Sequence, residues 1–458
     1  MVKEDLKLFN DIVEEFLKDE LQNPVTKQYS PRELKSKIDL KLKDTPTPSA
    51  DYKKTLKNIV LNTPKSSSNK FFNQLYGGRN SKAVLGDLLA VLLNNSMATY
   101  KIAGIQVCIE KEVIRKVCKI TGYNKNSGGT FPTGGSMSNF MSLIMARDKV
   151  DLSIQNDGNQ EKLIAYASRE AHYSLLKNMS FSGIGKKNIR YVTTNNKGQI
   201  DVGFLKKQIE LDLKEGLKPF YINLTAGTTV ICAFDPILEI IEICKKHNIW
   251  VHLDGAFGGT VIFSEKYNHL VNGISQTDSF CFNAHKTLGT PLSTSVLVVK
   301  NKQHLYNSFN NSASYLYQTH NNEYNLGQTS FECGRRNNAL KLWSMWKSIG
   351  TKGIAKIIDH EFFLAEYARK YVAEHEDYTL YNFENALSVC FNYKNYDPKE
   401  ICLKLYEKNE LMVGYGKFKN SRFIRLVLVN NNNTKKEVLN FFYTLENFVK
   451  KNSKQLKK

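Results

Sequence analysis

The chain reads WVHLDGAFGG at residues 250–259 and SFCFNAHKTLGTPLSTS at residues 279–295. Each segment opens with a short, mostly apolar run that is rich in β-branched or aromatic residues and ends at a polar residue. Runs of this length and composition predict buried parallel strands rather than helices. Ligands of open α/β sheets bind outside the carboxyl ends of the strands. We therefore expect the polar residues that end both runs to face one small molecule.

Those polar residues are Asp254 after the first run and Asn283, His285 and Lys286 after the second. An acid and a lysine at neighbouring strand ends suit the chemistry of pyridoxal phosphate. The lysine amine condenses with the aldehyde of the cofactor, and the carboxylate keeps the pyridine nitrogen protonated, so that the ring accepts electrons from a broken bond. An aspartate after a strand also serves as a helix cap or a turn residue, so this pair needs support from the rest of the chain.

The composition is that of a soluble globular protein, with 458 residues, 41% hydrophobic and 24% charged. No apolar run approaches the roughly 20 residues that span a bilayer. The first twenty residues carry acids and lack the apolar segment of a secretory signal, so we expect a cytoplasmic protein without a membrane partner. Eight cysteines show no metal-ligand spacing, and we expect them to be reduced, structural residues, with no metal bound.

The formal net charge of +20 raises the possibility of nucleic-acid binding. The lysines are scattered along the chain, however, and only the last residues, KKNSKQLKK, form a dense basic cluster. No basic motif interleaved with aromatic residues is present. This pattern favours a solvated surface and a basic tail over a nucleic-acid interface.

Strand and helix patterns alternate from about residue 162 to residue 300, which predicts an α/β domain with a mostly parallel sheet. Residues 1–70 read as an amphipathic helix followed by irregular chain, with the Pro- and Ser-rich stretches KDTPTPSADYKK and NTPKSSSNK as loops. Residues 71–350 form the predicted large domain. Residues 351–458 form a smaller α+β domain with the basic tail.

Three further segments carry candidate site residues. PTGGSMSN at 132–139 opens a helix after a glycine-rich turn, where free N–H groups suit a phosphate beside Gly135 and Ser136. His172 lies just inside a predicted helix, where it is either a capping residue or an imidazole that stacks on a planar cofactor. Arg335 and Arg336 lie at another predicted helix start, where a bound anion would offset their unfavourable interaction with the helix dipole.

Eight motifs in order over about residues 70–445 resemble the group II pyridoxal-phosphate-dependent amino acid decarboxylases, most closely the branch of glutamate, cysteine-sulfinate and aspartate decarboxylases. They are FFNQL at 71–75, PTGGSMSN at 132–139, AHYS at 171–174, TAGTTVICAFDP at 225–236, HLDGAFGG at 252–259, NAHK at 283–286, YLYQ at 315–318 and CGRR at 333–336. The resemblance implies fold type I, with a seven-stranded sheet in the large domain, a small C-terminal α+β domain and an N-terminal helical segment. It also implies a homodimer with active sites at the subunit interface.

The resemblance assigns roles to the candidate residues. Lys286 would attach the cofactor, Asp254 would pair with its ring nitrogen, and His172 would stack on the ring. Thr229 would lie near the ring, and the phosphate region would be served by Gly135, Ser136, Asn283 and His285. Gln74 and Arg335 would hold the substrate carboxylate, and Tyr324 would return a proton to the reacting carbon.

The chain also departs from the family pattern. Gly255 and Phe257 stand where the family usually has alanine and tryptophan, and the loop at 319–332 is shorter than in the animal enzymes. The placement of Tyr324 therefore depends on its EYNL context alone. Tyr76 stands where glutamate-specific members carry a small residue, and its ring would shorten the substrate pocket.

We therefore expect a decarboxylase of an acidic L-amino acid, with aspartate or cysteine sulfinate favoured and glutamate possible. The alternatives are a decarboxylase of histidine, diaminobutyrate or an aromatic amino acid, and a fold-type-I aminotransferase. An aminotransferase would yield a keto acid without releasing CO₂. A basic binding protein without enzymatic activity is a third alternative, and it would be colourless as purified.

Overall fold

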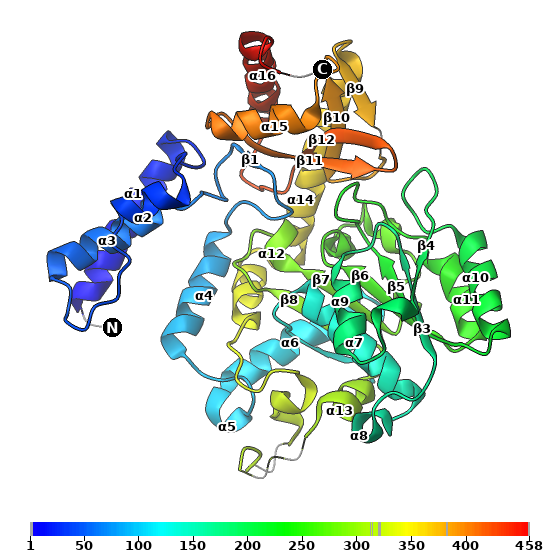
Figure 1. The fold of residues 1–458 in the computed structure, drawn as a ribbon. Coiled ribbons are helices and arrows are strands. Elements are labelled where there is room, and N and C mark those ends of the chain that lie inside the picture. The colour runs from blue at the N-terminus through cyan, green and yellow to red at the C-terminus, as the bar shows by residue number, and fades with distance from the viewer. Residues whose placement is uncertain (1–2, 312, 314, 319–321, 382, 457–458) are drawn as a thin grey trace. The chain divides into compact units, whose positions relative to one another are not determined.

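The computed structural model describes residues 3–311, 313, 315–318, 322–381 and 383–456 (Figure 1). The chain forms two compact units. The larger contains residues 79–365 and 383–388, and the smaller contains the remaining described residues at both ends of the chain. The domain boundaries near residues 70 and 350 stay a prediction, because compactness in space does not by itself define independently folding domains.

The larger unit is built on a seven-stranded sheet with the order β2-β8-β7-β6-β5-β3-β4. Its strands are β2 (Gly128–Thr130), β3 (Leu163–Ser168), β4 (Ile189–Val192), β5 (Lys218–Thr225), β6 (Trp250–Gly255), β7 (Ser279–Asn283) and β8 (Ser295–Val299). Strands β4, β3, β5, β6 and β7, in their order across the sheet, run parallel. Strand β8 is antiparallel to β7, and β2 is antiparallel to β8. The predicted mostly parallel, seven-stranded α/β architecture is confirmed.

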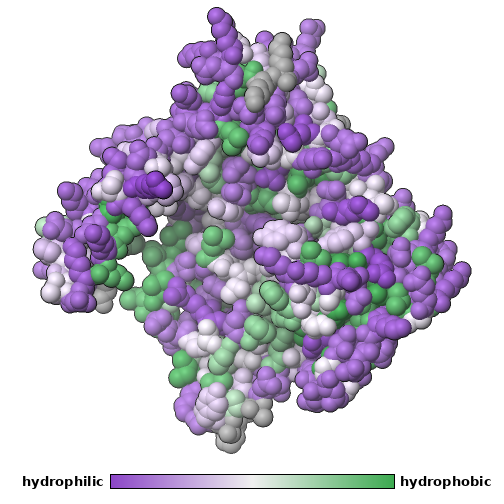
Figure 2. All heavy atoms as spheres, viewed as in Figure 1, coloured by the Kyte–Doolittle hydropathy of each residue, from purple (hydrophilic) through white to green (hydrophobic). Residues whose placement is uncertain are grey.

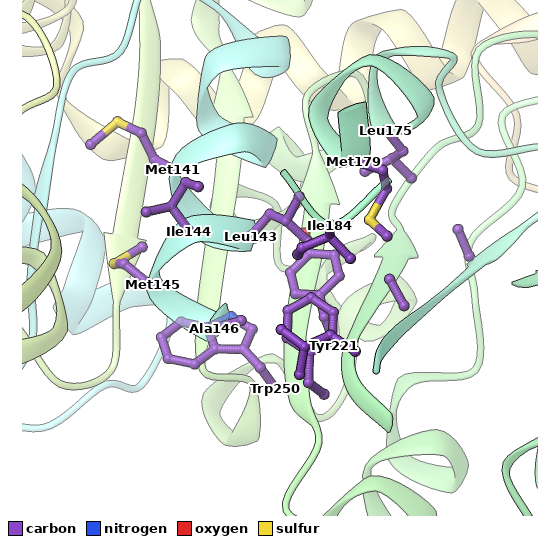
Figure 3. Packing of buried hydrophobic residues seen from close by; sticks show 14 of the residues in the cluster. Met141, Leu143, Ile144, Met145, Ala146, Leu175, Met179, Ile184, Tyr221 and Trp250 are labelled. Atoms are coloured by element: carbon purple, nitrogen blue, oxygen red, sulfur yellow. The ribbon is translucent and has the colours of Figure 1, made fainter. Parts of the chain in front are cut away.

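Helices connect and cover these strands. They are α4 (Ser81–Leu93), α5 (Tyr100–Ala103), α6 (Ile105–Ile120), α7 (Gly135–Val150), α8 (Ile154–Asp157), α9 (Ser174–Phe181), α10 (Val202–Lys214), α11 (Ile237–Lys246), α12 (Ala284–Thr287), α13 (Gln303–Phe309) and α14 (Ala339–Glu374). Most residues of α7 are buried, and the helix packs against the central strands. Figure 3 shows Met141, Leu143 and Met145 of α7 in the core that also contains Tyr221 and Trp250. The start of α7 is thereby held at the carboxyl ends of the central strands.

The smaller unit contains a five-stranded sheet with the order β1-β11-β12-β10-β9. Its strands are β1 (Phe71–Phe72), β9 (Tyr378–Tyr381), β10 (Ser388–Tyr393), β11 (Met412–Phe418) and β12 (Ser421–Val427). Its other helices are α1 (Lys3–Gln22), α2 (Pro31–Lys37), α3 (Ser49–Leu61), α15 (Pro398–Glu407) and α16 (Lys435–Asn452). The two-residue strand β1 pairs in parallel with β11, so chain from before the large unit completes a sheet that is otherwise formed after it.

Some local predictions were wrong. Residues 49–54, predicted as loop, belong to α3, because Pro48 is tolerated before a first turn and the apolar residues that follow favour a helix. Helix α9 begins at Ser174, so His172 precedes the helix instead of lying inside it. Helix α14 begins at Ala339, so Arg335 lies before the helix and not in its first turn.

Candidate active site

A cavity of about 200 Å³ lies at the carboxyl ends of the central strands of the larger unit. It is lined by residues from five segments that are distant in sequence: Gly135, Ser136, Asn139, His172, Tyr173, Thr225, Gly227, Thr229, Asp254, Ala256, Phe257, Asn283 and Lys286. The structure thus brings together most of the residues predicted for a cofactor site. Each lining residue lies in the last positions of a strand, in the segment that follows a strand, or near the start of α7.

Lys286 lies in α12, directly after β7, and its side chain lines the cavity. Burial lowers the pKa of its amine, and the nearby Asp254 carboxylate opposes this effect only in part. A lowered pKa increases the neutral fraction of the amine at neutral pH. The neutral amine is the nucleophile that condenses with an aldehyde, so the position and the environment of Lys286 suit covalent attachment of a cofactor.

Asp254 is the second-last residue of β6 and is 4% exposed. Its Oδ2 accepts a 2.7 Å hydrogen bond from Nδ2 of Asn139, and its Oδ1 accepts one from the backbone N–H of Ala256 at 2.9 Å. Both carboxylate oxygens are therefore held in fixed positions by donors of the protein, while the residue still lines the cavity. A fixed, buried carboxylate is the group needed to hold a proton on a ring nitrogen.

His172 lies between β3 and α9 and is half-buried at the cavity. Its Nδ1 accepts the backbone N–H of Ser174 at 3.2 Å, which places the proton of the neutral ring on Nε2. Burial lowers the pKa of His172, so the ring is neutral near pH 7. A neutral imidazole presents a flat face to an aromatic ring without adding charge.

The glycine-rich turn leaves space that any larger residue would fill. A Cβ atom at Gly135 would lie 2.9 Å from Cβ of Ala256 and 3.3 Å from Nδ2 of Asn283. The buried hydroxyl of Thr225, which lines the same cavity, has no hydrogen-bond partner among the described residues. The space beside Gly135 and the unpartnered hydroxyl of Thr225 fit a bound polar group.

The other predicted cofactor residues divide into two sets. Ser136, Thr229 and Asn283 line the cavity, and Oδ1 of Asn283 accepts a 2.7 Å hydrogen bond from Ser295. His285 is not among the lining residues. Its Nδ1 accepts the backbone N–H of Thr294 at 3.0 Å, and burial lowers its pKa to about 4. His285 therefore supports the loop after α12 as a neutral residue, and its role in phosphate binding stays a prediction.

Tyr324 lies outside the cavity lining, in the short 3-10 turn Asn322–Tyr324. Its ring packs edge-to-face with Tyr100 at a centroid distance of 5.8 Å, and Nζ of Lys111 lies 4.2 Å from its centroid. It borders a larger cavity of about 670 Å³ beside α6, which contains no other predicted catalytic residue. A role for Tyr324 in proton return would require the loop to leave this position.

Arg335 also lies outside the cavity lining, because its guanidinium forms a buried ion pair. Nη1 and Nη2 donate to the two carboxylate oxygens of Glu110, each at 2.7 Å, and the two side chains are 4% and 1% exposed. Both terminal nitrogens of the guanidinium are thus engaged with a carboxylate of the protein. In this arrangement Arg335 tethers α6 to the segment before α14, and substrate binding by Arg335 stays a prediction that requires this pair to open.

Replacing Glu110 with alanine is expected to lower the free energy of unfolding by about 3–5 kcal/mol, because Arg335 would be left as an uncompensated buried charge. Urea unfolding followed by circular dichroism measures this loss. The matched control is Glu112→Ala on the same helix, which removes an exposed pair with Arg115 and should change stability little. Equal losses in the two variants would contradict a buried, coupled pair.

Gln74 and Tyr76 belong to the smaller unit, where both follow β1 and are exposed. A half-buried cation that the sequence analysis did not single out lies beside this segment. Nη2 of Arg425 on β12 donates to the backbone oxygen of Asn73 at 3.0 Å, and burial lowers the pKa of its guanidinium. The available signal was an arginine within the apolar run RFIRLVLV, which is unusual for a strand interior.

Residues 31–394 match the model of the pyridoxal-dependent decarboxylase conserved domain. The chain belongs to the pyridoxal-dependent decarboxylase family. It is 32% identical over 392 residues to the acidic amino acid decarboxylase GADL1 of Xenopus tropicalis, covering 84% of this chain and 76% of that protein. It is 34% identical over 367 residues to human cysteine sulfinic acid decarboxylase, covering 79% and 74%. The crystal structure of mouse CSAD superposes with a TM-score of 0.91 at 29% identity, covering 96% of both chains.

The decarboxylase is thus an amino acid carboxy-lyase whose cofactor is pyridoxal phosphate. When bound, the cofactor accepts the electron pair that remains on the α-carbon as CO₂ departs. The residues that would hold it are those of the cavity, with Lys286 for the aldehyde, Asp254 for the ring nitrogen and His172 for the ring face.

Proposed function

We propose that this decarboxylase acts on acidic L-amino acids, with aspartate and cysteine sulfinate as preferred substrates and glutamate as a weaker one. The observation that carries the proposal is the similarity to relatives named acidic amino acid decarboxylase and cysteine sulfinic acid decarboxylase over about four-fifths of the chain. The net charge of +20 supports it, because a positive surface attracts anionic substrates.

A substrate panel tests this proposal directly. With aspartate, cysteine sulfinate, glutamate, histidine and dopa, CO₂ release should be fastest with the first two, because a short acidic side chain fits the proposed pocket. Keto acids are measured in parallel. Keto acid without CO₂ would indicate an aminotransferase, and CO₂ release from histidine or dopa alone would contradict the acidic preference.

Tyr76 is the residue we propose to limit side-chain length. The variant Tyr76→Gly is expected to raise kcat/KM for glutamate relative to aspartate, on the order of ten-fold, since one methylene is worth about 1–3 kcal/mol in a specificity pocket. Competition between the two substrates measures the ratio. A ratio unchanged from that of the parent enzyme would remove Tyr76 from the substrate site.

We also propose a cytoplasmic homodimer with the site roles given by the family resemblance. Among the described helices, none is long and apolar enough to cross a bilayer. Helix α4 buries only the small residues Ala83, Gly86 and Ala90. Most of its other apolar side chains are exposed and lie among the green atoms of Figure 2 at the place that α4 takes in Figure 1. Its exposed residues are Leu85, Leu88, Leu89, Val91, Leu92 and Leu93, each 43–66% exposed. An apolar surface of this kind marks a protein interface.

Charging this surface should dissociate the dimer. The double variant Leu88→Glu and Leu92→Glu is expected to sediment as a monomer in analytical ultracentrifugation, because two carboxylates would be buried without partners. Lys82→Glu, on the first turn of the same helix, is the matched control and should remain dimeric. A double variant that stays dimeric would place the interface elsewhere.

A further inference from the structure

A continuous set of buried polar side chains lies behind the Asp254 carboxylate. Trp250, His252 and Asp254 alternate along β6, so their side chains share one face of the sheet. On β7 the register places Ser279 beside His252. Asn139 and Ser142, three positions apart on α7, complete the set. All six side chains are buried, and Figure 3 labels one of them, Trp250, in the core beside α7.

Hydrogen bonds join these side chains in sequence. Nδ2 of Asn139 lies 2.7 Å from Oδ2 of Asp254, and Oδ1 of Asn139 lies 3.0 Å from Nε2 of His252. Nδ1 of His252 lies 2.8 Å from Oγ of Ser279. Nε1 of Trp250 lies 3.0 Å from that hydroxyl oxygen, and Oγ of Ser142 lies 2.9 Å from it.

The position of every proton in this chain follows from its partner. A carboxylate only accepts, so the Asn139 amide donates to Asp254 through nitrogen and presents its oxygen to His252. An amide oxygen also only accepts, so Nε2 of His252 carries the ring proton. Burial lowers the pKa of His252 to about 4, which keeps the ring neutral and leaves Nδ1 as an acceptor for Ser279. The Ser279 oxygen then accepts from Trp250 and Ser142.

We propose that His252 is a positioning residue for the reaction: by holding the Asn139 amide in one orientation, it keeps an N–H donor directed at the Asp254 carboxylate. Along the path from Trp250 through Ser279, His252 and Asn139, each residue donates its hydrogen bond to the next residue on the way to that carboxylate. Without the donor at Nε2 of His252, the Asn139 amide is free to rotate and to present its oxygen to Asp254, which repels the carboxylate. The carboxylate that faces the cofactor would then lose its fixed position.

This inference rests on the proposed role of Asp254, and the experiment separates the two. His252→Gln keeps a donor nitrogen near the position of Nε2, whereas His252→Leu removes it at similar volume. Equilibrium dialysis of the holoenzymes against pyridoxal phosphate measures cofactor affinity, and visible absorption reports the state of the bound cofactor. We expect His252→Leu to bind the cofactor about ten-fold more weakly, as the loss of a charge-assisted hydrogen bond predicts, and His252→Gln to remain near wild type in affinity and spectrum.

A matched pair of serine variants provides a second test of the proposal if His252→Leu does not fold. Ser279→Ala removes the donor to Nδ1 and should weaken cofactor affinity and change the spectrum, whereas Ser142→Ala leaves the path from Ser279 to Asp254 intact and should do neither. Equal effects of glutamine and leucine at 252, or of alanine at 279 and 142, would overturn the proposal and indicate packing alone. Asp254→Asn is measured alongside. If this variant also binds the cofactor as tightly as the wild type, the proposed pairing of Asp254 with the cofactor is wrong.

Discussion

Lys286→Ala is expected to abolish the visible absorption band of the lysine-bound cofactor and to lower the rate of CO₂ release on the order of 10³-fold or more, as loss of a covalent catalytic group does in other enzymes. The physical reason is that Lys286 is the one lysine among the described residues that line the cavity, and burial lowers the pKa of its amine. Absorption spectroscopy and a CO₂ assay measure the two effects.

Borohydride reduction of the wild-type enzyme gives an independent readout, because it fixes the cofactor on the lysine that holds it. Peptide mass mapping should find the added mass on Lys286. The matched control is Lys341→Ala, since Lys341 is also buried but donates to the backbone oxygen of Leu292 outside the cavity. A visible band that persists in Lys286→Ala, or a label on another lysine, would show that the attachment site is wrong.

Asp254→Asn is expected to lower kcat about 100- to 1,000-fold, the range observed when one preorganised electrostatic group is removed. An amide of the same shape occupies the site but has no charge to hold a proton on the ring nitrogen. The measurement is single-turnover CO₂ release, which separates chemistry from substrate binding.

Asp254→Glu serves as the comparison for this second prediction, because it retains the charge and alters only the reach. It should keep more activity than the asparagine variant. Asparagine and glutamate variants with the same residual rate would indicate that geometry, and not charge, limits the reaction. Turnover of Asp254→Asn close to that of the parent enzyme would contradict the assigned role.

The central sheet and the pairing of Asp254 with Lys286 were predictable from sequence, because both depend on short-range patterns. Apolar runs that end in polar residues predict strand ends, and the carboxyl ends of parallel strands meet at one edge of the sheet. The strand β11 was missed, because its MVGYGKF sequence contains two glycines and a lysine that weaken the strand pattern.

Contacts between distant segments could not be predicted. Arg335 looked like a cation available to an anion, and its partner Glu110 lies on a helix far away in sequence, in an unremarkable amphipathic pattern. His252 looked like one polar residue in an apolar strand. Its spacing of two from Asp254 indicated a shared face, but nothing in the sequence indicated that Asn139 of α7 would contact it.

The pairing of β1 with β11 has a consequence for how the protein is made. Phe71 and Phe72 are synthesised well before Met412 and Val413, their sheet partners, because the larger unit lies between them in the chain. Until then the apolar pair has no strand to join, and its backbone N–H and C=O groups lack the partners that β11 supplies. Synthesis of β11, rather than of β1, therefore sets the earliest moment at which β1 can pair within this sheet.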